Sequence, residues 1–490
     1  MKTATLSAMV ATAMSAALFL TLAIALAPPS AAATRSVPLT QVSADPYTTA
    51  GAEHATEAEP DVYGWGNTLV SAFQVGRYSD GGSDNTGWAT SVDGGHSWRH
   101  GFLPGATTVA GGKWSRISDP VVAYDAKHGT WLISGLAIDA NVNGIGVSVN
   151  SSTDGLTWHD PVLATGVRGE SYDKEWITCD NTVTSPHFGN CYVEVDETSA
   201  NDQVVMVTSA DGGKTWSPER TPKNQPHGLG GQPLVQPNGT VVVPYLSDSN
   251  DIRAFTSTDG GSSWNADVRV AATNSHNVTG MRADPLPSAQ IDGSGRVYVA
   301  WEDCRFRSGC SANDIVLSTS TDGQTWSPVT RVPIDPTTSG ADHFDPGIGV
   351  DHATSGGSAK LGLYYYFYPN ASCAATACQL EEGFVSSANG GSTWSAPKTL
   401  TAAMSLSWLA QAQGAMVGDY QGCAVLGGNA TGVFAVGAAA SGSTLNQAMD
   451  TAGPLPVAGG SLRGATAFSN IQPNPAIAAR TVPGVPQTLS

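Results

Sequence analysis

Ser91-Val92-Asp93-Gly94-Gly95-His96-Ser97-Trp98 is one copy of a short sequence that this chain of 490 residues contains six times. Copies of full length also begin at Ser209, Ser257 and Ser387, and copies one residue shorter begin at Ser152 and Ser320. Each copy is followed by a new apolar segment. Because self-similarity at a regular spacing reports a repeat architecture, this motif decides the fold before any other feature does.

The residues of the motif are those of a β-hairpin turn. Asp or Asn followed by Gly favours a tight turn, because such a turn needs positive φ angles. The Asp carboxylate can accept hydrogen bonds from backbone N–H groups of its own turn, and the Ser/Thr hydroxyls can join the two arms. The Trp ring is large enough to cover the underside of the hairpin. We therefore assign the motif residues a structural role in turns and not a catalytic one.

Short segments rich in Val, Ile, Tyr and Trp alternate with Gly-rich turns, and no long amphipathic helix is predicted. One type of strand is predicted seven times: Leu69–Phe73, Trp131–Ala137, Cys191–Val195, Val241–Leu246, Val297–Trp301, Leu361–Phe367 and Val433–Val436. Each is preceded by an acidic or amide residue beside a proline or its equivalent: Glu59-Pro60-Asp61, Asp119-Pro120, Asp173-Lys174-Glu175, Gln232-Pro233, Asp284-Pro285, Asp345-Pro346 and Gly418-Asp419-Tyr420. Since proline is excluded from the middle of a sheet, these segments should begin the innermost strands.

Repeated units of four antiparallel strands around one axis form a β-propeller, and this all-β architecture is our fold prediction. Seven blades are favoured, with the seventh completed by residues 36–42 pairing with the C-terminal part of the chain, and six blades are the alternative. The propeller should occupy residues 34–452. Residues 453–490 are rich in Pro, Ala and Gly and should be a loosely ordered tail or a strap along the outside.

The first residues resemble a secretory signal. Lys2 is followed by an apolar stretch over residues 16–27, and Ala31-Ala32-Ala33 provides small residues for cleavage. The apolar stretch is too short to span a membrane, so we expect cleavage near Ala33 and secretion without a membrane partner, and an uncleaved anchor is the alternative. We expect the extracellular chain to be a monomer. The formal net charge of −18 argues against nucleic acid as a partner.

Seven cysteines in an exported chain suggest disulfide bonds. Three pairs lie close in sequence, namely Cys179 with Cys191, Cys304 with Cys310, and Cys373 with Cys378. Cys423 is left over and should be buried in a strand. Neither the cysteines nor the histidines have the spacing of a zinc site.

The repeated motif resembles the Asp box, or BNR repeat, of the sialidase superfamily. Further stretches resemble secreted bacterial sialidase-like proteins, among them Asp173-Lys174-Glu175-Trp176-Ile177, Trp301-x-Asp303-x-Arg305-Phe306 and Gly418-Asp419-Tyr420. The resemblance implies a glycoside hydrolase of the exo-α-sialidase type that acts on extracellular glycans and needs no cofactor. Since Asp boxes also occur in other propellers, a non-catalytic glycan- or protein-binding propeller and a polysaccharide lyase are the alternatives.

In the sialidases that the motif resembles, three arginines bind the substrate carboxylate, a Tyr activated by a Glu is the nucleophile, and an Asp transfers the proton. One family arginine usually lies in a Phe/Tyr-Arg-Ile-Pro stretch on the first blade, which this chain lacks. The nearest stretch, Ser115-Arg116-Ile117-Ser118, comes before the second blade. We therefore look for the site in the residues of the predicted inner strands themselves.

Acidic residues at the starts of the inner strands should gather at one mouth of the axial channel. We predict Asp119, Asp173 and Glu175 as acid–base groups, Tyr420 as the nucleophile, and Arg116, Arg282 and Arg305 as the groups that bind an anionic sugar. The same acids could hold Ca²⁺, or could simply cap strand ends and bind neighbouring blades.

Overall fold

The structure is a computed structural model, which describes residues 37–166 and 169–466. Strands and turns dominate these residues, and the helices among them are five single turns of 3-10 helix: η1 (Thr108–Ala110), η2 (Thr198–Ala200), η3 (Ser308–Cys310), η4 (Gly356–Ser358) and η5 (Leu406–Trp408). Within the described residues, no helix is both long and apolar enough to cross a membrane. The leader predicted over residues 1–33 lies outside the described residues.

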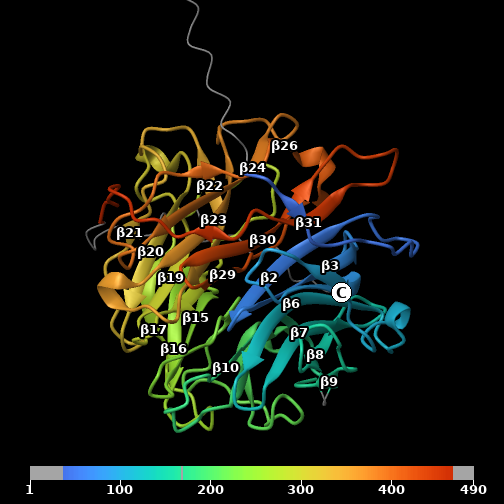
Figure 1. The fold of residues 1–490 in the computed structure, drawn as a ribbon. Coiled ribbons are helices and arrows are strands. Elements are labelled where there is room, and N and C mark those ends of the chain that lie inside the picture. Colours follow the sequence, from blue (N-terminus) through green and yellow to red (C-terminus); the bar gives the residue numbers. More distant parts are fainter. Residues whose placement is uncertain (1–36, 167–168, 467–490) are drawn as a thin grey trace, which may run out of the picture. The chain divides into compact units, whose positions relative to one another are not determined.

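The first half of the fold consists of antiparallel sheets that follow one another along the chain (Figure 1). An eight-stranded sheet contains β2 (Glu57–Trp65), β3 (Thr68–Arg77), β4 (Ser83–Ser91), β5 (Arg99–Phe102), β6 (Arg116–Asp125), β7 (Thr130–Ile138), β8 (Gly144–Ser152) and β9 (Val162–Leu163). The next sheets contain β10 (Tyr172–Cys179), β11 (Cys191–Glu197) and β12 (Gln203–Ser209), and then β13 (Gly228–Leu229), β14 (Leu234–Val235), β15 (Val241–Ser247), β16 (Asp251–Ser257) and β17 (Val268–Ala272).

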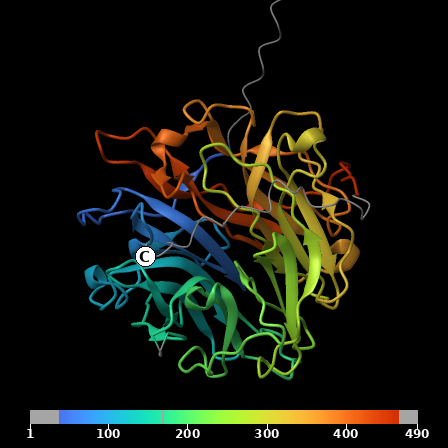
Figure 2. The same ribbon diagram turned by 180° about the vertical axis from the view of Figure 1, so that it is seen from behind.

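The second half repeats this pattern and returns to the chain start (Figure 2). Its sheets contain β18 (Ser288–Ile291), β19 (Val297–Asp303), β20 (Asp314–Ser320) and β21 (Thr330–Arg331); β22 (Asp342–Val350), β23 (Leu361–Tyr368), β24 (Gln379–Ser387), β25 (Lys398–Thr399) and β26 (Met404–Ser405); and the pair β27 (Ala410–Gln411) and β28 (Ala415–Met416). The last contains β29 (Cys423–Leu426), β30 (Asn429–Gly437), β31 (Gln447–Thr451), β32 (Leu455–Pro456) and the early strand β1 (Thr40–Gln41).

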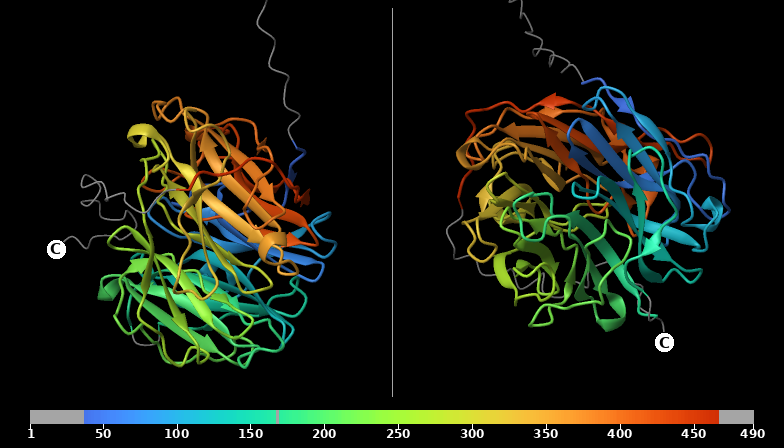
Figure 3. Two further views of the ribbon diagram at one scale, coloured as in Figure 1. Left: turned by 90° about the vertical axis from the view of Figure 1, so that its left-hand side faces the viewer. Right: turned by 60° about the horizontal axis from the view of Figure 1, so that its bottom comes forward.

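The innermost strands contact one another in a closed order, β2, β6, β10, β14, β18, β22, β29 and β2 again, so the sheets surround a common axis (Figure 3, right). This confirms the predicted all-β, antiparallel propeller. All seven predicted strands of the repeating type lie within β3, β7, β11, β15, β19, β23 and β30. The blade count stays a prediction, because the sheets range from two to eight strands, and one pair, Ser83 with Ile117, joins β4 to β6.

The two ends of the propeller pair as predicted. Thr40 and Gln41 of β1 pair antiparallel with Thr451 and Asp450 of β31. Part of the segment predicted as a tail also continues along the sheets, since Leu462 bridges Trp394 and Thr466 bridges Thr330. Residues 467–490 lie outside the described residues.

The six repeated motifs form the turns that the sequence predicts. In the first copy, the Asp93 carboxylate accepts backbone N–H groups of His96 (3.1 Å) and Ser97 (2.9 Å) and the Ser97 hydroxyl (2.6 Å). The Trp98 indole N–H donates to the Gly95 carbonyl at 3.2 Å. The three predicted disulfides are also present, and Cys423 is free and buried in β29.

Four innermost strands share a β-bulge near their starts. The bulge residues are Glu59 in β2 (φ 54°), Asp119 in β6 (φ 51°), Lys174 in β10 (φ 43°) and Asp345 in β22 (φ 46°). Rather than opening the strands, Pro60, Pro120 and Pro346 therefore follow a bulge within them, which is another position that tolerates proline. Positive φ in a residue with a Cβ costs about 1–3 kcal/mol, and this conformation is frequent at functional sites.

Candidate functional site

Three of the bulges and the segment before β29 bring four charged groups together at the mouth of the axis. The Lys174 Nζ lies 3.1 Å from Asp119 Oδ1, 3.1 Å from Asp419 Oδ2 and 3.8 Å from Glu59 Oε1. These residues come from β10, β6, the segment before β29, and β2, so four distant parts of the chain meet at one ammonium group. Together with Arg282 we call them the axial cluster.

Arg282 connects the axial cluster to the surface. Its Nε and one terminal nitrogen donate to the two oxygens of Asp419 at 2.7 and 2.5 Å, which is the fork geometry of a strong ion pair. Its other terminal nitrogen donates to Gln413 Oε1 at 2.9 Å. The side chains of Arg282 and Asp419 are 17% and 11% exposed, whereas that of Lys174 is 7% exposed, so the cluster opens toward solvent at this pair.

The carboxyl groups around the axial cluster differ sharply in pKa. Burial alone would raise the pKa of Asp419, but the nearby cations Arg282 and Lys174 hold it well below its usual range. Burial and the negative charge of Asp119 raise the pKa of Asp173 to about 7. The same two causes raise the pKa of Glu59 to about 7, and Lys174 limits the rise. A permanent anion and proton-carrying acids at one mouth can support acid–base chemistry.

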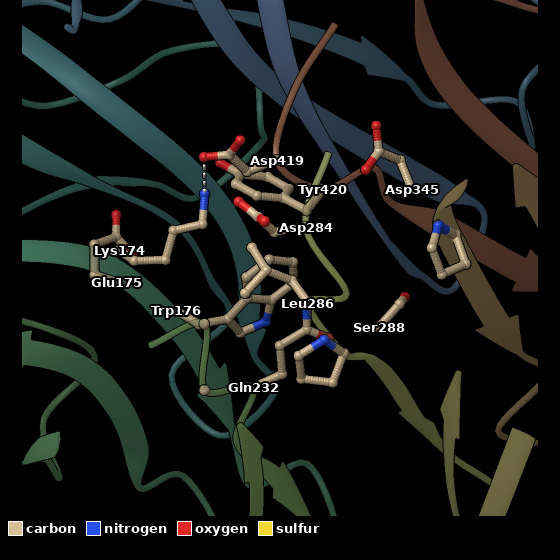
Figure 4. Close-up of a pocket in the computed structure, with 14 residues that line it drawn as sticks. Lys174, Glu175, Trp176, Gln232, Asp284, Leu286, Ser288, Asp345, Asp419 and Tyr420 are labelled. Atoms are coloured by element: carbon tan, nitrogen blue, oxygen red, sulfur yellow. Dashed lines mark hydrogen bonds and ion pairs between the residues drawn. The ribbon is translucent and has the colours of Figure 1, made fainter. Parts of the chain in front are cut away.

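A small cavity lies beside the cluster, lined by Lys174, Asp419, Tyr420, Asp284 and Asp345 among others (Figure 4). Its volume of about 10 Å³ is the space of a single water molecule. A second, open groove of about 840 Å³ lies next to the mouth.

The large groove shares two chain segments with the axial cluster. Gly280 and Ala415 line the groove, and Arg282 and Gln413 of the same segments belong to the mouth. The backbone N–H of Arg282 donates to the Ala415 carbonyl at 3.0 Å, which joins the two segments. We call this depression the mouth groove. Its volume falls in the range of about 300–1,000 Å³ that is typical of small-molecule sites.

The structure places the predicted acid–base residues at or near the cluster. Asp119 contacts Lys174, and Asp173 precedes Lys174 in β10 and is only partly buried. Glu175 is buried deeper, and its Oε2 accepts the Ser134 hydroxyl at 3.1 Å. Burial and the charge of Asp119 raise the Glu175 pKa well above its usual value.

Tyr420 is at the mouth as predicted, but its hydroxyl is engaged. It donates to the Pro120 carbonyl at 3.0 Å, and the Lys174 ammonium lies 4.7 Å from the centre of its ring. Burial raises the Tyr420 pKa well above its usual value. These contacts are those of a packing residue, and the nucleophile role stays a prediction.

The three predicted arginines do not share a partner. Arg116 pairs with Asp80 at 2.6 Å and lies over the Tyr78 ring, whereas Arg305 binds Asp303 at 2.8 and 2.6 Å. Only Arg282 belongs to the axial cluster. Each guanidinium already has its own carboxylate, so their joint role in binding an anionic sugar stays a prediction.

Lys174 is the central residue of the cluster, although the sequence placed it only among the basic residues of the mouth and gave it no catalytic or sugar-binding role. Its position was the available signal, because it occupies the bulge where the other inner strands carry Glu59, Asp119 and Asp345. A second missed feature is the imidazole of His276, which lies 3.0 Å from the buried Asp342 carboxylate. His276 and Asp342 are 66 positions apart in the chain, so no local sequence pattern predicts their contact.

One group among the described residues has metal-ligand geometry, namely Asp314, Asp335 and His343. Arg307 lies 2.6 Å from Asp314 and 2.7 Å from Asp335, and Arg331 lies 2.7 and 2.5 Å from the same carboxylates. Two guanidinium groups thus already neutralise the two acids, so the donors do not fit a cation. We call Arg307, Arg331, Asp314 and Asp335 the peripheral cluster; a Ca²⁺ ion at the mouth stays a prediction.

Comparison with known proteins gives a domain match and several structural neighbours. The BNR repeat-like domain matches residues 145–350. A protein of unknown function from Dyadobacter fermentans is 16% identical with a TM-score of 0.45, and the alignment covers 68% of this chain and 94% of that one. A comparison with curated protein sequences found no match.

Two sialidases are also similar. The Trypanosoma rangeli sialidase in complex with the inhibitor DANA is 14% identical with a TM-score of 0.43, covering 64% of this chain and 53% of that one. A Hadza microbial sialidase is 17% identical with a TM-score of 0.42, covering 64% of both chains. This chain thus spans about half to two thirds of these sialidases, and such distant neighbours carry no argument about activity. The matched domain and the six Asp boxes together show a BNR-repeat fold, which is the fold of the sialidase superfamily.

Proposed function

We propose that this protein is an exported glycoside hydrolase of the sialidase-like class that acts on the ends of extracellular glycans. The observation that carries the proposal is the pair of carboxyl groups with opposite pKa perturbations at the mouth, Asp173 and Asp419, next to a groove of about 840 Å³. Hydrolysis of a glycosidic bond needs a proton donor and a fixed negative charge near the positive charge of the transition state.

In this proposal, the mouth groove holds the glycan and Asp173 protonates the leaving oxygen. A pKa of about 7 leaves Asp173 largely protonated in mildly acidic solution and about half protonated near pH 7. Asp419, held as a carboxylate by Arg282 and Lys174, stabilises the oxocarbenium-like charge. The water-sized cavity beside Asp419 gives room for the attacking water, whose proton passes to Asp173, which is ionised once it has protonated the leaving oxygen.

A second candidate is a propeller that binds glycans without hydrolysing them. It is favoured by the pairing of Arg116, Arg282 and Arg305 with Asp80, Asp419 and Asp303, since none of these three guanidinium groups is left to bind a sialic acid carboxylate on its own. The third hypothesis, a polysaccharide lyase, would need a base such as His276.

The test is a panel of fluorogenic glycosides, including an α-sialoside, with protein that begins at residue 34. Turnover of one member that Asp173→Asn abolishes supports the hydrolase. If no member of the panel is turned over and the protein binds saturably to a glycan array, the hydrolase is ruled out and the glycan-binding propeller is supported. Export is tested separately: the secreted protein should have an N-terminus just after Ala33, and a retained leader would contradict it.

A further inference from the structure

We infer that the face opposite the mouth carries a second saccharide-binding surface, which takes a neutral polysaccharide chain. It consists of an exposed aromatic platform, Trp65 on Tyr124, and an adjoining groove of about 510 Å³. We call the two together the far-face site. It goes beyond the proposed hydrolase, because it would anchor the protein to polymer whether or not the mouth is catalytic.

The direction of β2 separates the far-face site from the mouth. β2 begins beside the axial cluster, where Glu59 contacts Lys174, and it ends at Trp65. Six residues of strand at about 3.3 Å each place Trp65 about 20 Å from Glu59. A ligand on the platform therefore does not occupy the mouth.

Ring packing and hydrogen bonds hold the platform in place. The Trp65 ring is stacked on Tyr124 at 5.3 Å with an interplanar angle of 29°, and Tyr124 packs on the buried Trp131 at 4.8 Å. The Asn181 amide fixes the layer from below, donating to the Tyr124 carbonyl at 2.8 Å and the Tyr63 hydroxyl at 3.3 Å. Trp65 is nevertheless 37% exposed, so the platform offers a large ring to solvent at little entropic cost.

The groove begins one residue after the platform, because Gly66 and Asn67, which follow Trp65 in the chain, line it. Three further polar side chains of the groove, His96, Asn429 and Thr431, can donate and accept hydrogen bonds, and the Asp93 carboxylate accepts them. The apolar lining comes from Leu69, Leu426, Pro454 and Pro456. A flat aromatic ring beside amide, carboxylate and hydroxyl groups matches a sugar chain, which has apolar C–H faces and a rim of hydroxyls.

Charge restricts the class of polymer. Among the described residues that line the groove there is no lysine or arginine, and Asp93 contributes a carboxylate. Nucleic acids and polyuronates are polyanions that need cationic contacts, and the net charge of −18 on the chain repels them further. A neutral polysaccharide is the occupant that these contacts accept.

The test is affinity electrophoresis and pull-down of the mature chain with neutral polysaccharides (cellulose, chitin, xylan, mixed-linkage β-glucan and starch) and with alginate as the acidic control. The protein is produced in a host that does not glycosylate, because Asn429-Ala430-Thr431 is a glycosylation sequon in the groove. We expect binding to at least one neutral polymer and none to alginate. Trp65→Ala should weaken that binding by about tenfold, and Trp65→Phe by no more than about threefold.

Val109→Ser, at an exposed position in η1 outside the far-face site, is the matched control and should bind as the parent chain does. Asp173→Asn should also bind normally, which distinguishes failure of the far-face site from failure of the proposed hydrolase. Retention of binding by Trp65→Ala, its loss in Asp173→Asn, or no binding to any neutral polymer would each overturn the inference, provided that thermal melting shows every variant folded.

Discussion

The axial cluster and the peripheral cluster use the same chemistry for different ends. In the peripheral cluster, two guanidinium groups face two carboxylates, and every separation lies between 2.5 and 2.7 Å. In the axial cluster, one ammonium is shared by three carboxylates at 3.1 to 3.8 Å, and Arg282 is committed to one of them. The peripheral cluster has equal numbers of positive and negative charges. In the axial region the acids outnumber the cations, so the pKa values of Glu59 and Asp173 are raised and these groups keep their protons to higher pH.

The backbone explains the difference. The axial side chains of Glu59, Asp119 and Lys174 come from bulges with positive φ, which are maintained only when the surrounding structure fixes them. The peripheral acids Asp314 and Asp335 have no such backbone conformation and brace Arg307, next to the Cys304–Cys310 disulfide. Strained backbone, split pKa values and an adjoining groove distinguish the axial cluster from the peripheral cluster, and the proposed chemistry rests on these three features.

Removal of the shared cation should have the largest effect on stability. Lys174→Met leaves Asp119 without its ion-pair partner in a buried site, and we expect a loss of about 3–5 kcal/mol in the free energy of unfolding. Arg331→Met is the matched change in the peripheral cluster, where Arg307 still contacts both acids, and it should cost about 1–3 kcal/mol. Denaturant titrations of both variants check this. Equal losses would end the distinction between the clusters.

Removal of a proton donor should affect activity rather than folding. On the glycoside identified by the panel, Asp173→Asn should lower kcat by about 100-fold or more, because an amide cannot donate the proton. Asp335→Asn, the control from the peripheral cluster, should keep kcat within about threefold of the parent. The proposed acid would be ruled out by an unchanged kcat in Asp173→Asn, or by a similar fall in both variants.

The raised pKa values of the axial region should make the fold more stable in acid. The pKa is raised to about 7 for Glu59 and Asp173 and to about 8 for Glu57, in each case mainly by burial. The folded state then binds more protons than the unfolded state between about pH 4 and 8, so the free energy of unfolding falls as pH rises through this window. Denaturant titrations at pH 5 and pH 8 measure the fall.

Glu57→Gln isolates one contribution to this pH dependence. Its amide oxygen can still accept the Met449 N–H, which lies 2.9 Å from the Glu57 carboxylate, but it cannot ionise. The variant should lose less stability between pH 5 and pH 8 than the parent, by up to about 1.4 kcal/mol for each unit of pKa shift. A parent chain that is more stable at pH 8 than at pH 5 would contradict the sign.

The sequence predicts the frame of this molecule better than its site. The Asp boxes, the seven repeating strands, the disulfides and the pairing of β1 with β31 all follow from local patterns, because turn chemistry and strand alternation are short-range signals. The gathering of acidic residues at one mouth also follows from the repeat, but the shared contact of Lys174 with Asp119 and Asp419 does not. It depends on the bulges at Asp119 and Lys174, and on loops that bring Arg282 to Asp419 across 137 positions.

The Asp-box turns contain a third class of carboxylate, which is neither deeply buried nor part of an ion pair. Substitutions of these carboxylates should have the smallest effect on stability. The Asp211 carboxylate accepts hydrogen bonds from the Thr215 N–H at 2.9 Å and from the Thr215 hydroxyl at 2.6 Å. In the copy of the motif that has Asn389 at this position, the amide oxygen accepts from the Thr393 N–H at 2.9 Å, and the amide nitrogen donates to the Thr393 hydroxyl at 2.9 Å. Asp211→Asn should therefore leave the melting temperature within about 1 °C, whereas Asp211→Ala should lower it by about 1–2 °C. Scanning calorimetry resolves the two, and a larger loss from the Asn variant would mean that the charge itself holds the turn, which would weaken the contrast between exposed and buried carboxylates.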